Sequence, residues 1–243
     1  MAIRTHTAPA GPAVLDLTQY TGRITIRVDQ AAVRAGITVR VDAESGPAAE
    51  AVRGTGIEQS GQRITVTVPE ASGTAGSGGG ITVGGGRVII GGVDVTGGFG
   101  AGAPAEIETA VALPPGSWVR LTTRTATTTA SGALESLDYS GTSGHLVADE
   151  VGDLALTLTS GRVTVAHVTR RLDATLTSGH VGVHAYDGGD ARLTLTSGHA
   201  HIAATPASRG RFSIGLTSGH ATLTGARHLD VTRRVTGGHL TVS

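Results

Sequence analysis

Residues 154–165 read Leu-Ala-Leu-Thr-Leu-Thr-Ser-Gly-Arg-Val-Thr-Val, and residues 172–183 repeat the phrase as Leu-Asp-Ala-Thr-Leu-Thr-Ser-Gly-His-Val-Gly-Val. The phrase returns at 193–202 and 212–223, and in more divergent form at 143–148 and 236–242. A unit that recurs at a nearly fixed interval is typical of an architecture built by stacking copies of one element. The intervals between the repeat glycines are 17, 18, 19, 21 and 19 residues, counted over Gly144, Gly161, Gly179, Gly198, Gly219 and Gly238.

Apolar residues occupy fixed places on both sides of each repeat glycine. Positions two and four after Gly161 hold Val163 and Val165, and positions three and five before it hold Leu158 and Leu156. Each arm therefore alternates with period two, which predicts a β-strand with one buried face and Thr, Arg or His on the other. Glycine at the corner indicates either a backbone position with positive φ or a close approach of the next coil.

Two arrangements of these strands satisfy the pattern. If Ser160-Gly161 is the loop of a hairpin, Leu158 and Val163 lie opposite each other on one face. If it is the corner of a coil, each repeat stacks on the one before and buries its apolar face on a near copy of itself. Only the stacked coils are stabilised by the regular repetition of the sequence, because each coil then packs on an equivalent one. The sequence thus favours an all-β fold, a single-stranded parallel β-solenoid of short Thr-Ser-Gly repeats with a β-rich N-terminal cap region.

The chain divides into four stretches of different composition. We expect a flexible N-terminus at 1–13, which is polar and contains proline, and a β-rich cap at 14–70, with one short helical stretch at Pro47–Arg53. Residues 71–105 are predicted to be a glycine-rich loop excursion, and residues 106–243 carry the repeat array.

The glycine-rich stretch contains two candidate short strands, at 81–83 and 87–90. Glycine loops can hold phosphates at the N-terminus of a helix. Here no helix follows and no Gly-Lys-Ser/Thr is present, so the stretch is not predicted to bind phosphate.

The repeat phrase resembles a known family. Arms of the form Thr-Ser-Gly-x-Val/Ala-x-Val/Ile, joined by short Gly/Asp linkers after a β-rich N-terminal part, are similar to the adhesin-like β-repeat family known as DUF4097. The similarity covers residues 106–243 well and the N-terminal third loosely. The family is grouped with pectate-lyase-like β-helices, so the resemblance implies a β-helix, and it implies no established activity.

Composition excludes several classes of partner and site. Acidic and basic residues balance at 19 each, which gives no general attraction to nucleic acid or to acidic membranes. Aromatic residues make up 2% of the chain, which predicts a thin core of Leu, Val, Ile and Ala. Cysteine is absent, so disulfides and thiolate metal sites are excluded. We find no apolar signal region and no stretch of the roughly 18 apolar residues that a membrane helix needs. These features predict a cytoplasmic protein without membrane insertion or nucleic-acid partners, while a cell-surface role stays open.

The residue after each repeat glycine forms a row of basic side chains. Neighbouring coils of a solenoid lie about 4.8 Å apart, so these side chains are predicted to stack. Two or three imidazoles at that spacing can bind Zn²⁺, Ni²⁺ or Cu²⁺, or they can act as a pH switch, because charging near pH 6.5 makes neighbours repel. The simpler interpretation is an exposed turn residue copied with each repeat, since no carboxylate keeps register with the row. The row is His145, Arg162, His180, His199, His220 and His239, and the candidate metal ligands are His180, His199, His201 and His220.

Carboxylates and hydroxyls give weaker candidates. Asp153, Asp190 and Asp230 lie eight residues before a repeat glycine, whereas Asp173 lies six before its own. The acid row therefore skips a coil and leaves no close acid pair of the kind that cleaves glycosides. Outward Thr-x-Thr pairs on three coils resemble ice-binding arrays, but threonine is also favoured on any exposed strand.

The sequence therefore predicts a non-enzymatic structural or protein-interaction module. The alternative is a metal-binding or pH-sensing histidine row, and a carbohydrate-active β-helix enzyme is the weaker alternative. No cofactor is expected apart from a metal on that row. An open solenoid end is an unpaired sheet edge, and the last repeat runs to Val242-Ser243 without a polar cap. We thus expect contacts with other proteins, or with a second copy, through the solenoid ends.

Overall fold

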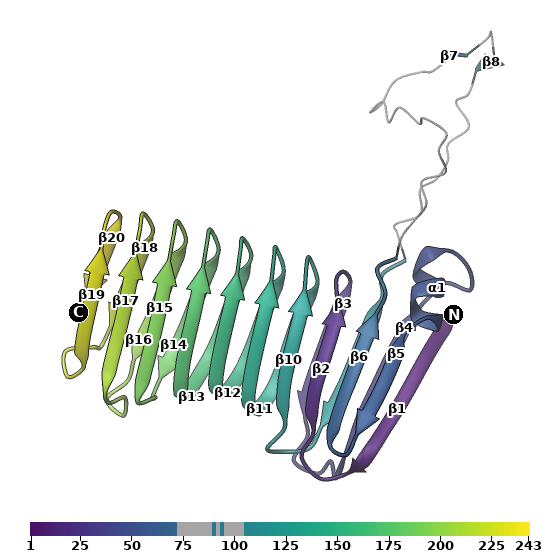
Figure 1. Cartoon of the computed structure of the whole chain (residues 1–243), viewed down its shortest axis with the longest axis horizontal. Helices are drawn as coiled ribbons and strands as arrows, with labels where there is room; N and C mark the ends of the chain where they lie inside the picture. The colour runs from purple at the N-terminus through teal and green to yellow at the C-terminus, as the bar shows by residue number, and fades with distance from the viewer. Residues whose placement is uncertain (72–88, 91–92, 95–104) are drawn as a thin grey trace.

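The computed structural model describes residues 1–71, 89–90, 93–94 and 105–243. It is an elongated stack of β-coils, with the helix α1 (Pro47–Arg53) at one end and the last strand at the other (Figure 1). Eighteen of the described strands form one continuous sheet, and most of their pairings are parallel. No helix in the described part of the chain is long and apolar enough to span a membrane.

The repeat array folds as coils rather than hairpins. Leu158 pairs with Leu176 on the next coil and not with Val163, and Thr157, Thr175 and Thr194 pair in one register across three coils. The parallel β-solenoid is therefore confirmed, and the hairpin alternative is wrong. The strands of the array are β11 (Thr127–Gly141), β12 (His145–Leu158), β13 (Arg162–Leu176), β14 (His180–Tyr186), β15 (Asp190–Leu195), β16 (His199–Ala204), β17 (Arg211–Leu216), β18 (His220–Thr224), β19 (Asp230–Val235) and β20 (His239–Val242).

The core is a set of apolar columns that run along the stack. In one column each residue pairs with its equivalent on the next coil, and every member from Val66 to Ile214 is buried. The column consists of Val66, Leu17, Leu121, Tyr139, Leu156, Ala174, Leu193 and Ile214. Small aliphatic side chains dominate, as the scarcity of aromatics predicts. The exceptions include Tyr186 and Phe212, whose rings meet edge to face at 5.8 Å in the interior.

Close stacking explains the glycine at three of the corners, whereas Gly238, at the last corner, also has a positive φ of 89°. Gly161, Gly198 and Gly219 lack a positive φ. A Cβ on each of them would lie only 2.1 to 2.5 Å from the corner carbonyl oxygen of the preceding coil. That contact sits beside the hydrogen bonds that join the corners, such as the one from His199 N to Gly179 O at 2.9 Å. Of the two reasons for glycine that the sequence left open, the structure supports the close approach at these corners.

The N-terminal coils are interleaved out of chain order. The coil of β2 (Val14–Gln19) and β3 (Arg23–Val28) pairs on one side with β6 (Arg63–Val68) and β9 (Glu108–Leu113). On the other side it pairs with β10 (Trp118–Thr123) and β11. The coil of β2 and β3 therefore lies between the end of the stack, which contains β6 and β9, and the first coil of the array, which contains β10 and β11. The chain forms β2 and β3 first, then the strands at the end of the stack, and only then the array.

The first ten residues correct the prediction of a flexible N-terminus. They form β1 (Ala2–Ala10), which pairs antiparallel with β4 (Arg34–Val41), and Ala2 and Ala8 are buried. Because β4 pairs with β9 on its other side, β1 satisfies the backbone groups that would otherwise be left on its open edge. Pairing to a distant strand gives these polar residues an order that their composition does not reveal.

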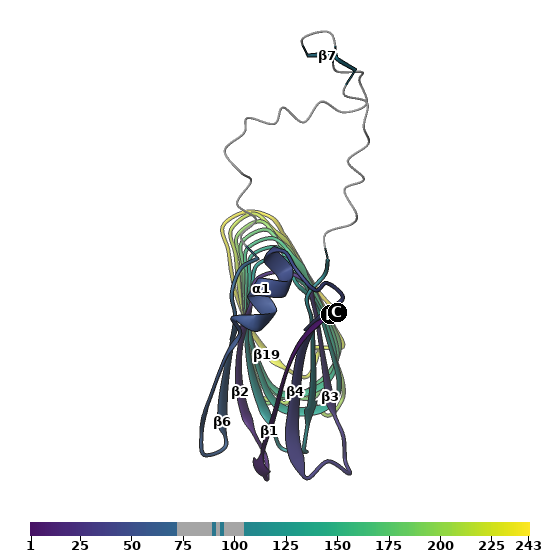
Figure 2. The ribbon, with the colours of Figure 1, turned by 90° about the vertical axis from the view of Figure 1, so that its right-hand side faces the viewer.

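A short helix and a hairpin close this end of the stack. The predicted helical stretch is confirmed as α1, whose Ala49, Ala51 and Val52 are buried in the core. Figure 2 shows α1 lying across the end of the coils, above β1 and β4. The hairpin of β5 (Gly56–Ser60) with β6 completes the other side of this end.

The glycine-rich excursion begins and ends at a coil corner. Val68, at the end of β6, pairs with Gln19, and Glu108, at the start of β9, pairs with Arg23. Most of the 71–105 stretch, including the predicted strand at 81–83, lies outside the described residues. Within it the structure describes β7 (Ile89–Ile90) and β8 (Val93–Asp94), which pair antiparallel.

Candidate functional site

The row of residues after the corner glycines forms a stack of imidazole rings, which we call the histidine ladder: His180, His199, His220 and His239. They pair in register as the first residues of β14, β16, β18 and β20. The ring centroids of His180 and His199 are 4.8 Å apart, and those of His199 and His220 are 5.2 Å apart, with planes inclined by 18° and 17°. The ladder loosens at its end, where the last two centroids are 6.3 Å apart.

The ladder borders a shallow groove of about 380 Å³ on the outer side of these strands. Arg162 precedes the ladder in register on β13, and His201 lies two residues along β16 from His199. The groove is open at Gly182, where an added Cβ would meet no atom within 4 Å. Its lining is Arg162, Val163, Thr164, His180, Val181, Gly182, His199, Ala200, His201, His220 and Thr222. None of these residues is acidic.

The ladder histidines differ from the paired histidines elsewhere in the molecule. His6 lies 2.7 Å from Gln59 Oε1, His167 lies 2.8 Å from Asp187 Oδ2, and His228 lies 3.1 Å from Ser208 Oγ. Within the described ranges, no hydrogen-bonding side chain and no carboxylate partners the ladder rings. Stacking on one another is thus their only close ring contact there.

The stacked geometry bears on the predicted metal site. Among the described residues, no three His, Asp or Glu side chains are placed to hold a metal ion together. Nearly parallel rings direct their nitrogen lone pairs in parallel, whereas a tetrahedral ion needs donors that converge on one point. His180, His199 and His220 would have to turn out of the stack to bind Zn²⁺, Ni²⁺ or Cu²⁺, with His201 beside them. Metal binding by these residues stays a prediction.

The aspartate row found in the sequence is interleaved with arginine. Asp153 pairs with Arg171, Arg171 with Asp190, and Arg211 with Asp230. Asp190 and Arg211 lie next to the paired residues Ala191 and Phe212 and continue the row. Arg211 Nε lies 3.2 Å from Asp230 Oδ2, and the Arg211 backbone N–H donates to Asp190 Oδ1 at 3.3 Å. We call the outward surface of β2, β6, β10, β15, β17 and β19, with the parts of β11, β12 and β13 that lie in register with them, the acid–base face. Asp153, Asp190 and Asp230 lie two coils apart in this row, whereas Asp173, on the coil next to Asp153, lines a shallow pocket together with it.

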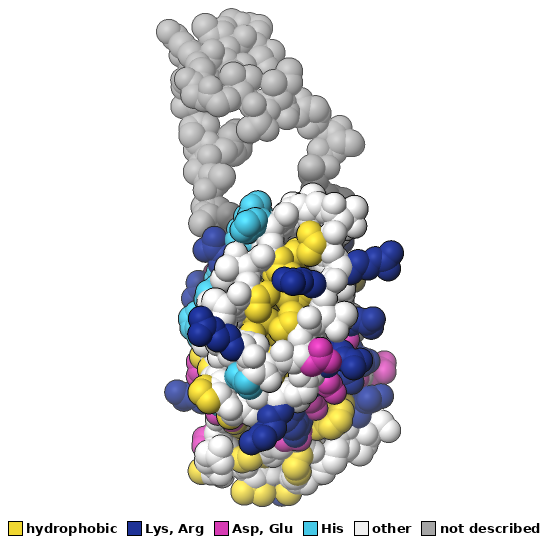
Figure 3. Space-filling model, turned by 90° about the vertical axis from the view of Figure 1, so that its left-hand side faces the viewer, with side chains coloured by type: hydrophobic (Ala, Val, Ile, Leu, Met, Phe, Trp, Pro, Cys, Tyr) yellow, Lys and Arg dark blue, Asp and Glu magenta, His cyan; other side chains and the backbone are white. Residues whose placement is uncertain are grey.

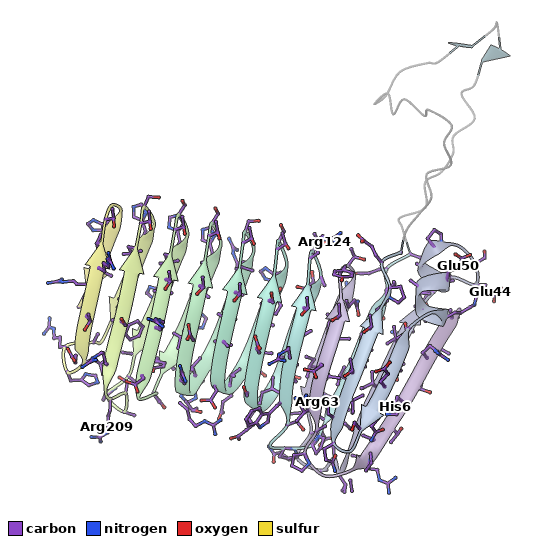
Figure 4. All side chains as sticks on the ribbon, in the orientation of Figure 1. His6, Glu44, Glu50, Arg63, Arg124 and Arg209 are labelled. Atoms are coloured by element: carbon purple, nitrogen blue, oxygen red, sulfur yellow. The ribbon has the colours of Figure 1, made fainter. Side chains whose placement is uncertain are left out.

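Sequence reasoning missed this alternation because it followed the acids alone. Other ion pairs on the same face join neighbouring coils, including Arg120 with Asp138 at 2.9 Å and Arg63 with Asp16 at 3.4 Å. Figure 4 shows Arg63 projecting outward from this side of the stack. The face balances its own charge from coil to coil.

Within the described part of the chain, the coil of β19 and β20 pairs only with the coil before it and exposes part of the core. Val235 is 43% exposed and Val242 is 36% exposed, whereas their equivalents on the preceding coil, Leu216 and Leu223, are buried. Arg233 pairs with the buried Ile214 and therefore occupies the next position of the apolar column. Figure 3 shows hydrophobic side chains in the middle of this end, with a basic side chain across them.

Comparisons with known proteins support the fold. No protein-family model matches the chain, and no curated protein sequence matches it. Among solved structures, a putative adhesin from Bacteroides fragilis matches with a TM-score of 0.56 at 9% identity, covering 99% of this chain and 97% of that one. A putative adhesin from Parabacteroides merdae matches with a TM-score of 0.49 at 13% identity, covering 100% and 96%. A putative cell adhesion protein from Clostridium sporogenes matches with a TM-score of 0.34 at 10% identity, covering 99% and 97%. The Bacteroides fragilis match shows that the two chains share their fold.

Proposed function

We propose that the protein is a non-enzymatic, adhesin-like interaction module in which the solenoid is a rigid scaffold for outward rows of side chains. The observation that carries the proposal is the register, which repeats the same side chain at the same place on consecutive coils. The shared fold with a putative adhesin supports it, as does the resemblance to the DUF4097 family. The adhesin name of that neighbour also favours the cell-surface role over the cytoplasmic location that the sequence predicts.

The contact surface in this proposal is the C-terminal coil, which would meet another protein or a second copy of the chain. Among the described strands, β19 pairs only with β17 and β20 only with β18, and unpaired edges recruit further strands. Val235 and Val242 add exposed apolar surface beside those edges. At the other end, α1 covers the core instead.

Light scattering on the purified chain at several concentrations tests contact between copies. The mass should rise with concentration, and Val242→Asp should shift it toward the monomer by placing a charge at the exposed edge. Thr122→Asp on the paired strand β10 is a matched control that should leave the mass unchanged. A monomer at every concentration would remove self-contact through this end.

A pH-sensing or metal-binding role is the second candidate, favoured by the 4.8 and 5.2 Å stacking of the ladder rings. Charging adjacent rings at that distance makes them repel. Elemental analysis of protein purified without a His tag reports bound Zn, Ni or Cu. Comparison with a His180→Ala, His199→Ala, His220→Ala variant assigns any metal, or any change in stability between about pH 5 and 8, to the ladder. Absence of both effects would exclude this role.

A further inference from the structure

The strand β19 holds alternate backbone groups toward the open side of its coil. The Asp230 N–H donates to Gly210 O at 3.2 Å, and the Thr236 N–H donates to Leu216 O at 2.9 Å, both on the side of the preceding coil. Successive residues of a strand turn their backbone groups to opposite sides, so the residues between these two bonds alternate in the same way. The backbone groups that point to the open side, where no described strand pairs with β19, are those of Val231, Arg233 and Val235.

The side chains of β19 follow the same alternation. Val231 and Val235 pair with buried residues of β17 and therefore extend two apolar columns, and Arg233 extends the column between them. Arg234 pairs with a residue on the outward side. A strand added to this edge would thus meet an inward row of valine, arginine and valine and an outward row that includes a second arginine.

The charge of this part of the stack is basic. Residues 205–243 contain five arginines and one acidic side chain, whereas residues 105–204 contain six arginines and ten acidic side chains. The one acidic side chain, Asp230, is already paired with Arg211 at 3.2 Å. Figure 3 shows basic side chains around and across the hydrophobic middle of this end. The open edge therefore combines apolar surface with positive charge.

We propose that the open edge of β19 binds an extended acidic segment of another protein, which adds one more parallel strand to the stack. In this mode of recognition, main-chain hydrogen bonds give affinity and alternate side chains give specificity. A segment of the form Val-Thr-Glu-Glu-Val would place its valines in the two apolar columns and its glutamates beside Arg233 and Arg234. The inference rests on the proposed interaction-module function and names the partner of its C-terminal coil.

A second copy of the chain fits this edge less well than an acidic segment. Residues 231–235 read Val-Thr-Arg-Arg-Val, so parallel pairing of two copies in register would place Arg233 beside the same residue of the other copy. Like charges that face each other across an interface oppose association. The other end of the stack offers no open core, because α1 lies across it (Figure 2). We therefore expect contact between copies only at higher concentration than binding of an acidic segment.

The two arginines are expected to contribute unequally. An added strand would exclude water from Arg233, so an apolar residue beside it would leave a desolvated guanidinium without a partner. Arg234 stays on the outward side in water, where salt screens an ion pair and reduces its effect. The acid beside Arg233 is therefore the side chain that decides which segments bind.

Fluorescence anisotropy with labelled, end-capped peptides tests the proposal. The probe carries Val-Thr-Glu-Glu-Val between Gly-Ser flanks, and its matched control carries Val-Thr-Arg-Arg-Val, the sequence of β19 itself. We expect the acidic probe to bind at least about tenfold more tightly at low salt, and this preference should shrink as salt is added. Arg233→Glu should reverse the preference, and Arg234→Glu should have a smaller effect. Arg27→Glu, on the distant strand β3, is the control variant and should change nothing.

Methylation of the peptide backbone tests strand addition. In a parallel pair, the second and fourth residues of the probe would turn their N–H groups toward β19. N-Methylation of these two residues should abolish binding, whereas N-methylation of the first and third should weaken it less. Equal effects of the two patterns would overturn strand addition.

The remaining outcomes separate this inference from the proposed function. An acidic probe that binds no more tightly than the basic one, or an unchanged preference in Arg233→Glu, would overturn the acidic segment as the occupant. If the mass then still rose with concentration in light scattering, contact between copies would stand without this inference. Binding of the acidic probe by a chain that stays monomeric would support the inference and exclude self-contact. Circular dichroism confirms that each variant folds.

Discussion

At the scale of single residues, glycines on neighbouring coils differ in whether a side chain would fit at their position. A Cβ on Gly198 would lie 2.5 Å from Gly179 O, whereas a Cβ on Gly182 would meet nothing within 4 Å. We expect Gly198→Ala to lower the free energy of unfolding by about 2 kcal/mol or more, because two backbones must separate. Gly182→Ala should change it by less than about 1 kcal/mol, in the stabilising direction. Urea titrations followed by circular dichroism measure both, and equal effects would contradict close stacking as the reason for the corner glycine.

Tyr186 gives the molecule a dependence on alkaline pH. The side chain is buried, its hydroxyl has no partner among the described residues, and burial, aided by the nearby Asp190 charge, raises the pKa of the phenol above its usual value near 10. The unfolded chain therefore ionises first. The contribution of Tyr186 to stability is complete below about pH 10 and is lost as the pH rises beyond it.

The substitution Tyr186→Phe should retain or raise stability near pH 7, by up to about 1 kcal/mol, because it removes an unpaired buried hydroxyl. It should also reduce the loss of stability above pH 10. Tyr139→Phe is the matched control. Tyr139 accepts a hydrogen bond from Thr123 at 3.0 Å, so losing that hydroxyl should lower stability near pH 7 by about 1 kcal/mol. Denaturant titrations near pH 7 and above pH 10 distinguish the two variants. Equal changes in the free energy of unfolding would contradict the difference between the two hydroxyls.

The burial of the apolar repeat residues could be predicted from sequence, because period-two alternation reports directly which side chains face the core. The contacts that a residue makes with a neighbouring coil could not be predicted in this way. The alternation of Asp190 with Arg211 and the place of Arg233 in a core column both follow from register, and register is fixed only when the coils stack. The ladder was found because its histidines keep one offset from glycine, whereas the groove needs the space at Gly182.

At the scale of elements, β1 tests how the N-terminal end is held. Deleting residues 2–10 should expose the edge of β4 and speed amide exchange in a peptide covering 34–41, because the seven residue pairs between β1 and β4 are lost. Peptides from β17, at the far side of the stack, should keep their protection. Hydrogen exchange followed by mass spectrometry makes this comparison. If the 34–41 peptide exchanged as before, the first residues would be dispensable, as a flexible N-terminus predicts.

The strands and corners of the repeat array could be predicted because each repeat contains them in the same order. The order in which the first coils stack could not be predicted. Placing β2–β3 between β6–β9 and β10–β11 depends on pairings between strands that lie up to about a hundred residues apart, as Asp16 with Arg120 does. No local signal encodes such partners, and the divergent N-terminal third lacks the repeat that sets register elsewhere.

At the scale of the whole molecule, Arg233 bears on the proposed association through the C-terminal coil. It places a charge in a column that is apolar on every preceding coil, and inward charges are a known protection for sheet edges. Arg233→Leu should therefore raise the mass seen by light scattering at a given concentration. Arg234→Leu is the matched control, because its equivalent on the preceding coil is the outward Gly215. An equal effect of both changes would mean that charge alone, rather than the position in the column, limits association.

The central claim is that the solenoid is a rigid scaffold that holds outward rows of side chains, such as the histidine ladder, in one register. Imidazole NMR of the labelled protein tests this most directly, because each ring reports its own neighbours. We predict nuclear Overhauser contacts between the rings of His180 and His199 and between those of His199 and His220, whose centroids lie 4.8 and 5.2 Å apart. The rings of His6 and His228 should show no such contact with the ladder. Absence of the ladder contacts, or contacts that skip a coil, would contradict the account.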